Sequence, residues 1–285
     1  MSGPVGSRTS VGTRALPRSR PSAIALDNRR AITDRDRNIC LDLYDHKVLT
    51  IEQITNLHFD AVRRARRRLL KLVELGVLER FRLPRSPGSS PFHYILGPVG
   101  IEIVAAYRGV EPKELPVRLD RLRGLAYNQR LAHLLAINGF FSRLARACRS
   151  RTGFRLAEWW SEGKCAHVWG GLVRPDGLGA VWWPAGSVRF FLEMDRGTEN
   201  LAQLEGKLVG YHRVARFPDA PDALLFVFPT QRREVEARKV LAGAGMPIAT
   251  ATAADALSDP VGEIWLVVGG EVRIALTALG GGEAR

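Results

Sequence analysis

Three carboxylates and a lysine in the second half of the chain have types and spacing suited to work on a phosphodiester. Asp176 follows a proline at the start of one expected strand, and Glu193 and Asp195 lie at the end of the next. Alternation along a strand places Glu193 and Asp195 on one face. If the two strands are antiparallel neighbours, Asp176 lies at the same sheet edge. Three carboxylates there predict a site for a hard divalent cation such as Mg²⁺.

A bound cation of this kind can activate water and stabilise charge on a phosphodiester. Glu199, Gln203 and Lys207 follow at i, i+4 and i+8 of an expected helix, on one side of it. From that side Lys207 could lean toward the carboxylates. The alternative is structural: the Pro-Asp-Gly sequence is a common turn, Arg174 or Arg196 could pair with the strand-end carboxylates, and Lys207 could be an ordinary exposed lysine.

A second informative group of residues is basic. Six of the nine positions from 63 to 71 are Arg or Lys, and apolar residues supply the other side of an expected helix from 61 to 75. We expect the basic side to enter the major groove of double-stranded DNA, because arginine donates to guanine edges and to phosphates. The alternative is a solvated charged helix, although such helices usually mix both signs. The expected DNA-contacting residues are Arg63, Arg64, Arg66, Arg67, Arg68 and Lys71 of this helix, with Arg80, Arg82 and Arg85 of the hairpin after it.

Capping signals and hydrophobic patterns predict the elements that must carry this basic helix. Thr33, with Asp36 three residues on, is typical of a helix cap, and Thr50 begins a capping box; they indicate the starts of two short helices before it. After it, residues 77–83 and 92–96 are typical of a β-hairpin with a basic tip, and a fourth helix follows. Three helices and such a hairpin predict a winged helix-turn-helix over residues 31–110.

The rest of the chain predicts a second unit. Residues 111–124 are expected to be a linker, and residues 125–280 follow the order helix, three strands, helix, strand, which predicts an α/β sandwich around a central mixed sheet. Residues 1–30 are rich in Ser, Gly, Pro and Arg without apolar periodicity, and we expect a disordered basic arm there. The expected fold class is therefore α+β.

Amino-acid composition limits the kinds of protein that this chain can be. The chain has 285 residues, 46% of them hydrophobic, and a formal net charge of +13, so it can bury a core and its charge favours a polyanionic partner. More than half of that excess lies within residues 61–85. Apolar runs are too short for a membrane span and no hydrophobic signal region is present, so a cytoplasmic location is expected. Cys40, Cys148 and Cys165 lie far apart, which favours reduced, buried thiols.

The Pro-Asp strand and the Glu-x-Asp strand, flanked by helices in this order, resemble the PD-(D/E)XK nuclease fold. The resemblance implies that Asp176 and Glu193 hold magnesium and that a lysine supports the attacking water. Asp195 stands where that pattern expects the lysine. In some members of the superfamily the lysine comes from the following helix, and Lys207 is the nearby candidate for that role.

Two sets of motifs carry a further resemblance. The first, which many winged helices share, is Thr33-x-Arg35-Asp36, Leu49-Thr50-x-x-Gln53-Ile54, Arg67-x-Leu69-x-x-Leu72-x-x-Leu75-Gly76 and Tyr94-x-Leu96-x-x-x-Gly100. The second, more specific, is Arg174-Pro175-Asp176, Glu193-Met194-Asp195-Arg196-Gly197-Thr198-Glu199 and Leu204-x-x-Lys207-x-x-x-Tyr211. With these motifs, residues 31–276 resemble the replication-relaxation family of plasmids and other bacterial mobile elements. The resemblance implies a role in plasmid replication and in relaxation of plasmid DNA.

The sequence thus predicts a DNA-binding protein whose second unit could nick DNA with Mg²⁺ held by Asp176, Glu193 and Asp195, while Lys207 positions water. The alternative is a non-catalytic regulator or replication initiator whose degenerate nuclease-like domain serves dimerisation, and the departure at Asp195 favours it. A homodimer is compatible with both. A relaxase or topoisomerase with a tyrosine nucleophile is a third hypothesis, disfavoured because no histidine cluster surrounds Tyr127 or Tyr211.

Overall fold

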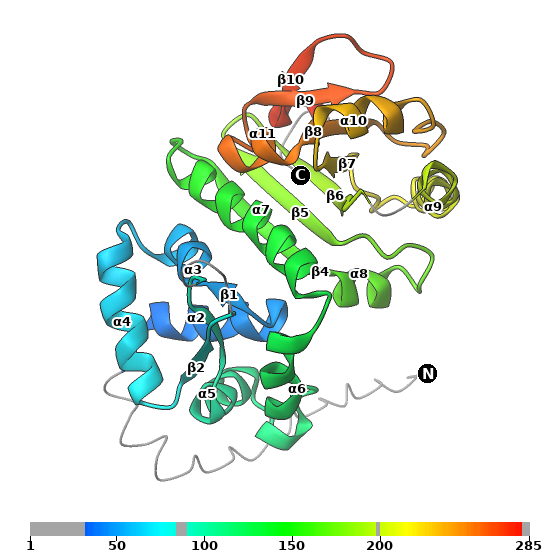
Figure 1. The fold of residues 1–285 in the computed structure, drawn as a ribbon. Coiled ribbons are helices and arrows are strands. Elements are labelled where there is room, and N and C mark those ends of the chain that lie inside the picture. The colour runs from blue at the N-terminus through cyan, green and yellow to red at the C-terminus, as the bar shows by residue number, and fades with distance from the viewer. Residues whose placement is uncertain (1–31, 84–89, 198–199, 281–285) are drawn as a thin grey trace, which may run out of the picture.

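A computed structural model of the chain describes residues 32–83, 90–197 and 200–280 (Figure 1). The expected disordered arm and the expected DNA contact Arg85 lie outside the described residues. The chain forms an N-terminal helical unit with a small sheet and a second unit built on a large sheet, with the long helix α7 between them. The mixed α and β content agrees with the expected class.

The N-terminal unit contains the helices and the hairpin expected between residues 31 and 110. Both expected caps form, since Thr33 accepts from the Asp36 backbone and Thr50 accepts from the Gln53 backbone, and each is a capping box. The basic helix stops before Gly76, whose φ of +67° suits a residue without a Cβ. The helices are α2 (Asp34–His46), α3 (Ile51–His58), α4 (Val62–Glu74) and α5 (Pro98–Arg108), and the antiparallel sheet has the order β1 (Leu49–Thr50), β3 (His93–Leu96), β2 (Leu78–Phe81).

The segment expected to be a linker is folded onto the N-terminal unit. It forms short helices, η2 (Pro112–Glu114), α6 (Leu119–Gly124) and η3 (Leu125–Tyr127). Leu115 and Leu122 are buried in the core of that unit, and this burial orders the segment. The long helix α7 (Leu131–Arg149) therefore begins later than the expected residue 125.

The second unit is built on a seven-stranded mixed sheet of order β10-β9-β8-β7-β6-β5-β4. Strands β4, β5 and β6 form an antiparallel meander, while β6, β7 and β8 run parallel, as crossovers through α9 and α10 allow. The predicted order of helix, three strands, helix and strand is present, with one unpredicted short helix (Glu162–Val168) between the first two strands. The strands are β4 (Arg155–Ser161), β5 (Gly177–Trp183), β6 (Gly186–Met194), β7 (Ala223–Phe228), β8 (Ile248–Thr252), β9 (Glu263–Val267) and β10 (Arg273–Ala275), and the helices are α8 (Glu162–Val168), α9 (Leu201–Val214), α10 (Gln231–Arg238) and α11 (Ala253–Ser258), before η4 (Leu276–Leu279).

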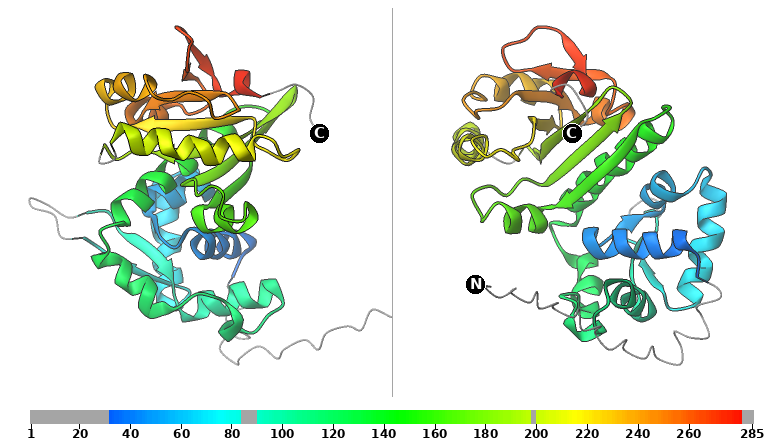
Figure 2. Two further views of the ribbon diagram at one scale, coloured as in Figure 1. Left: turned by 90° about the vertical axis from the view of Figure 1, so that its right-hand side faces the viewer. Right: turned by 180° about the vertical axis from the view of Figure 1, so that it is seen from behind.

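Helices cover both faces of this sheet, with α7 and α11 on one face and α9 and α10 on the other (Figure 2). Alternate residues of β6 consequently enter different cores. Phe190 and Leu192 pack in the layer that contains α7, whereas Phe191 packs in the layer that contains α9. Glu193 has the same parity as Phe191, so the backbone directs its side chain toward α9.

Helix α7 also joins the two units, because it packs against α3 as well as against the sheet. Buried Asn138 donates to the Val48 carbonyl oxygen at 2.7 Å. The Gln53 side chain donates to the Leu135 carbonyl oxygen at 2.8 Å. These bonds satisfy polar groups that packing has removed from water, so the contact between the units is specific rather than merely apolar.

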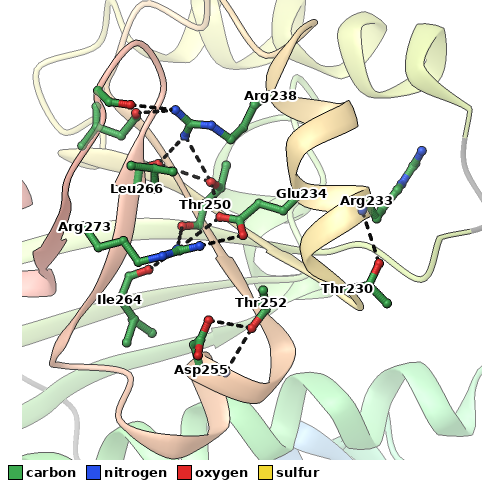
Figure 3. Close-up of polar contacts among 12 residues, drawn as sticks. Thr230, Arg233, Glu234, Arg238, Thr250, Thr252, Asp255, Ile264, Leu266 and Arg273 are labelled. Carbon is green, nitrogen blue, oxygen red and sulfur yellow. Dashed lines mark hydrogen bonds and ion pairs between the residues drawn. The ribbon is translucent and has the colours of Figure 1, made fainter.

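A buried polar network holds the β8 to β10 edge of the sheet (Figure 3). Glu234 of α10 is 1% exposed and accepts from Arg273 at 2.9 Å and from the Thr250 hydroxyl at 2.7 Å. Arg238 donates to the carbonyl oxygen of Leu266 at 2.8 Å. Because both Glu234 oxygens have donors, we interpret the network as an anchor for α10 and the β9–β10 hairpin.

Two expectations from composition can be compared with this fold. The three cysteines, Cys40, Cys148 and Cys165, are buried free thiols, as predicted, and burial raises the pKa of each. In the part of the chain that the structure describes, no helix combines the length and the apolar character needed to cross a membrane.

Candidate functional site

The basic side of α4 faces solvent, and its apolar side packs in the N-terminal core. Arg63, Arg64, Arg66, Arg67 and Lys71 are exposed, whereas Ala65, Leu69 and Leu72 are buried. Among the described residues, none of the four exposed arginines forms an ion pair. Lys71 has a 3.5 Å contact with Glu74 that is open to solvent. The exposed guanidinium groups are therefore available to an external anion.

Arg68 differs from its neighbours on α4, because it pairs with a buried carboxylate; its expected contact with DNA stays a prediction. Its Nε lies 2.8 Å from Oδ1 of Asp36, and its Nη2 contacts the other oxygen. Asp36 is fully buried and also accepts from the Thr33 hydroxyl at 2.7 Å. Burial acts to raise the pKa of Asp36, but the hydrogen bonds from Arg68 and Thr33 lower it below its usual value. Arg68 thus stabilises a buried carboxylate.

A cationic groove of about 540 Å³ lies between the start of α2 and α4. Arg64, Arg67, Arg68 and Lys71 line it on the α4 side, and Arg35 lines it from α2. Arg35 also lies over the ring of Phe59, 4.9 Å from its centroid. The sequence places Arg35 in a capping motif, but only the packing of α2 against α4 makes it part of the basic surface.

The hairpin adds a second basic surface to this unit. The guanidinium carbons of Arg80 and Arg82 lie 4.1 and 3.7 Å from the centroid of the Phe92 ring. Both arginines are exposed. Stacking on Phe92 limits the conformations of two side chains that would otherwise be mobile, while their polar edges remain open to solvent.

Where β5 begins and β6 ends, the register of the sheet brings Asp176 and Glu193 together. Gly177 of β5 pairs with Leu192 of β6, so the next position of the antiparallel ladder sets Asp176 opposite Glu193. One Asp176 oxygen accepts from the Met194 backbone at 2.7 Å. The other lies 2.8 Å from Nε2 of His133, in the first turn of α7. The expected meeting of these two carboxylates is therefore present.

Glu193 is 5% exposed and has a donor on each oxygen. The Tyr211 hydroxyl donates at 2.5 Å, and Nζ of Lys207 lies 3.0 Å from the second oxygen. Burial raises the pKa of Glu193 to about 7; the Lys207 ammonium opposes this rise, and the Asp176 carboxylate adds to it. Burial and Glu193 together raise the pKa of Tyr211, so its hydroxyl stays protonated and donates.

Asp195 does not join this pair, which corrects the expectation of a three-carboxylate site. Its carboxylate is 1% exposed and lies 2.7 Å from Nε of Arg233 on α10. The structural alternative therefore applies to Asp195, but the partner is Arg233 rather than Arg174 or Arg196. Across residues 32–83, 90–197 and 200–280, no group of three His, Cys, Asp or Glu side chains is arranged to hold a metal ion.

Helix α9 explains why Lys207 and Tyr211 reach the same carboxylate. They are four residues apart, so both side chains leave the helix on one side, toward the end of β6. This i, i+4 relation was a signal in the sequence that could have assigned Tyr211 to the site. His133 had no such signal, because it lies 43 residues from Asp176 and reaches it only through the packing of α7.

The chemistry of the donor set decides which cation these residues fit. Each carboxylate oxygen has two lone pairs, so Asp176 and Glu193 retain acceptor capacity beyond their present hydrogen bonds. Mg²⁺ commonly binds one or two carboxylates together with waters and phosphate oxygens. Asp176 and Glu193 therefore fit Mg²⁺ when a phosphate accompanies it, and they do not form an all-protein cage. Arg174 and Arg196 are exposed near them in the sequence.

Comparisons with known proteins give one family match. The family model described as Replication-relaxation matches residues 41–223, which include α4 and the second unit through the start of β7. A comparison with curated proteins found no match. Among solved structures, the restriction endonuclease FokI is similar with a TM-score of 0.32 and 15% identity, over 78% of this chain and 43% of that one. The chain thus spans less than half of the FokI chain, and so low a TM-score supports no argument.

Proposed function

The chain belongs to the replication-relaxation family, and from this premise we propose that it binds and nicks DNA during replication of a plasmid or mobile element. In this proposal the N-terminal unit is a winged helix that holds double-stranded DNA. The second unit is a PD-(D/E)XK-like domain that cleaves one strand. The observation that carries the proposal is the meeting of Asp176, Glu193 and Lys207 at one sheet edge.

The proposed DNA contacts follow from the exposed charge on α4. Arg63, Arg64, Arg66 and Arg67 have no ion pair among the described residues, so binding to DNA costs them no existing partner. A helix with this basic face can enter the major groove and donate to both base edges and phosphates. We expect neighbouring phosphates to be contacted by Arg35, which lines the groove, and by Arg80 and Arg82 of the hairpin. Lys71 would exchange only a solvent-exposed pair.

In the proposed reaction Asp176 and Glu193 would hold Mg²⁺ near the scissile phosphate. The cation, when bound, supplies charge neutralisation and an acidified water. Lys207 is 35% exposed, so its ammonium can contact both Glu193 and a phosphate or water at the rim. Tyr211 fixes the orientation of Glu193 through its hydroxyl. His133, with its proton on Nε2, fixes Asp176 in the same way.

A second candidate function is a regulator or replication initiator without catalysis, in which the second unit mediates dimerisation. The pairing of Asp195 with Arg233 favours it, because one of the three expected ligands is neutralised by the protein itself. The hydrogen-bond donors that the protein supplies to Asp176 and Glu193 also favour this non-catalytic function, since a cation must compete with them.

Incubation of supercoiled plasmid with the full chain and Mg²⁺ tests between these candidates. We expect nicked plasmid from the wild type, loss of nicking in Asp176→Asn and Glu193→Gln, and unchanged duplex binding in both variants. Glu205→Gln, an exposed acid on α9, is the matched control and should nick like the wild type. Calorimetry with Mg²⁺ alone reports cation uptake separately.

Nicking by Asp176→Asn at the wild-type rate would contradict the catalytic proposal. Absence of both nicking and Mg²⁺ uptake in the wild type would support the non-catalytic regulator or replication initiator. Several salt concentrations are needed, because binding to DNA weakens steeply as salt rises.

A further inference from the structure

Tyr127 is 91% exposed at the end of η3, in a basic stretch of the chain. Arg121, Arg123 and Arg130 are exposed on either side of it. Arg123 pairs with Glu79, but among the residues that the structure describes neither Arg121 nor Arg130 forms an ion pair. An exposed aromatic ring close in the chain to exposed guanidinium groups is a combination with which proteins bind unpaired nucleotides.

The position of Tyr127 connects it with the candidate cleavage site. The chain passes from Tyr127 into α7 and reaches His133, which lies 2.8 Å from Asp176. Six residues of chain span at most about 20 Å, which is about six nucleotides of a stacked strand. A strand whose phosphate lies at Asp176 can therefore place a nearby base on Tyr127.

The recognition surface and the candidate site face different sides of the molecule. Figure 1 shows α4 on the outer side of the N-terminal unit and α9, which carries Lys207, on the opposite side of the molecule, with α7 between them. A straight duplex seated on the exposed side of α4 would lie away from Lys207. The candidate site consequently needs a contact surface of its own for the strand that it cleaves.

We propose that Tyr127, Arg121 and Arg130 form a stacking platform that holds an unpaired DNA strand beside the site of Asp176 and Glu193. The phenol ring takes the face of one base, and the two arginines take flanking phosphates. Stacking on a ring tolerates any base, so the platform adds affinity without sequence preference. The role in cleavage rests on the function proposed above, whereas the binding of the strand can be measured without it.

Fluorescence anisotropy with a labelled oligo-dT on the order of ten nucleotides tests the platform in the full chain. We expect Tyr127→Ala to weaken binding about 5- to 100-fold and Tyr127→Phe to bind nearly as the wild type, because phenylalanine keeps the ring. Tyr107→Ala is the matched control, since Tyr107 is also an exposed tyrosine, 60% exposed, but lies on α5. Arg130→Ala should weaken binding and reduce its salt dependence.

Wild-type affinity of Tyr127→Ala for oligo-dT would overturn the platform, and so would tighter binding of oligo-rU than of oligo-dT. Loss of oligo-dT binding in Arg63→Ala/Arg67→Ala equal to that in Tyr127→Ala would also overturn it, because the strand would then bind on α4. If the proposed nicking function is wrong but the platform exists, the wild type will not nick plasmid, while oligo-dT binding will still depend on Tyr127.

Discussion

The two units hold their charges in opposite ways. On α4, Arg63, Arg64 and Arg67 point into solvent and have no ion pair among the described residues. In the second unit, Asp176 and Glu193 are largely withdrawn from water and each accepts from donors of the protein itself. Exposed charge is nearly free of desolvation cost and can act on a polyanion from outside, whereas buried charge requires internal partners.

Because exposed and buried charges behave so differently, residue type alone does not indicate which charges a ligand can use. Arg67 and Arg68 are neighbours on one helix and both line the open groove, yet only Arg68 binds buried Asp36. Glu193, in β6, and Asp195, just after it, are two residues apart, yet Lys207 binds one and Arg233 binds the other. Each pair supplies a test in which near-identical substitutions should have different consequences.

The largest expected effect is that of Arg68→Ala on stability. Removal of Arg68 leaves the Asp36 carboxylate buried without its main cation, which costs about 3–5 kcal/mol in the free energy of unfolding. Urea denaturation measures this loss. Arg67→Ala is the matched control and should change stability by no more than about 0.5 kcal/mol; equal effects of the two would contradict the distinction drawn between them.

The next largest effect is that of Lys207→Ala on nicking. If Lys207 stabilises charge at the phosphate, its removal should lower the rate about 10²- to 10³-fold, and Lys207→Arg should restore part of it. Asp195→Asn should have a much smaller effect on Mg²⁺ uptake than Asp176→Asn, because Arg233 pairs with one oxygen of Asp195 and holds this carboxylate apart from Glu193. Rates with supercoiled plasmid and Mg²⁺ calorimetry provide the two measurements, and equal Mg²⁺ loss in both Asp variants would restore the three-carboxylate site.

A smaller effect is expected for Arg67→Ala on duplex binding. Loss of one phosphate contact should reduce the slope of log K against log salt by about 1. Anisotropy of a labelled duplex at several salt concentrations measures that slope. Arg143→Ala, an exposed arginine on α7 that pairs with Glu52, is a control outside the basic face and should leave the slope unchanged.

The smallest effect concerns acid stability. The pKa of Asp36 is lower in the folded chain than its ordinary value of 3.8, so its ionised form stabilises the fold above that value. This contribution is lost as the pH falls below about 4 and through the folded pKa. The difference in unfolding free energy between the wild type and Asp36→Asn should therefore shrink on acidification. A difference that stays constant to lower pH would contradict the role of the charge.

Much of the fold followed from short-range signals. Thr33 and Thr50 accept from backbone groups three residues ahead, and Gly76 stands where the backbone needs a positive φ. The meeting of Glu193 with Lys207 was also predictable, because α9 follows β6 directly and the two residues are 14 apart. The folding of residues 111–124 was not, since Leu115 and Leu122 become informative only when another core accepts them.

Local sequence patterns were enough to predict most of the longer elements, the basic side of α4 and the strand ends that bear the carboxylates, because each depends on a local period or on capping within one turn. The tertiary structure decided which charge has which partner. Arg68 and Asp36 are 32 residues apart, Arg233 and Asp195 are 38 apart, and His133 and Asp176 are 43 apart. Such pairs form when packing removes a carboxylate from water beside a distant cation or donor, and no period along the chain records that choice.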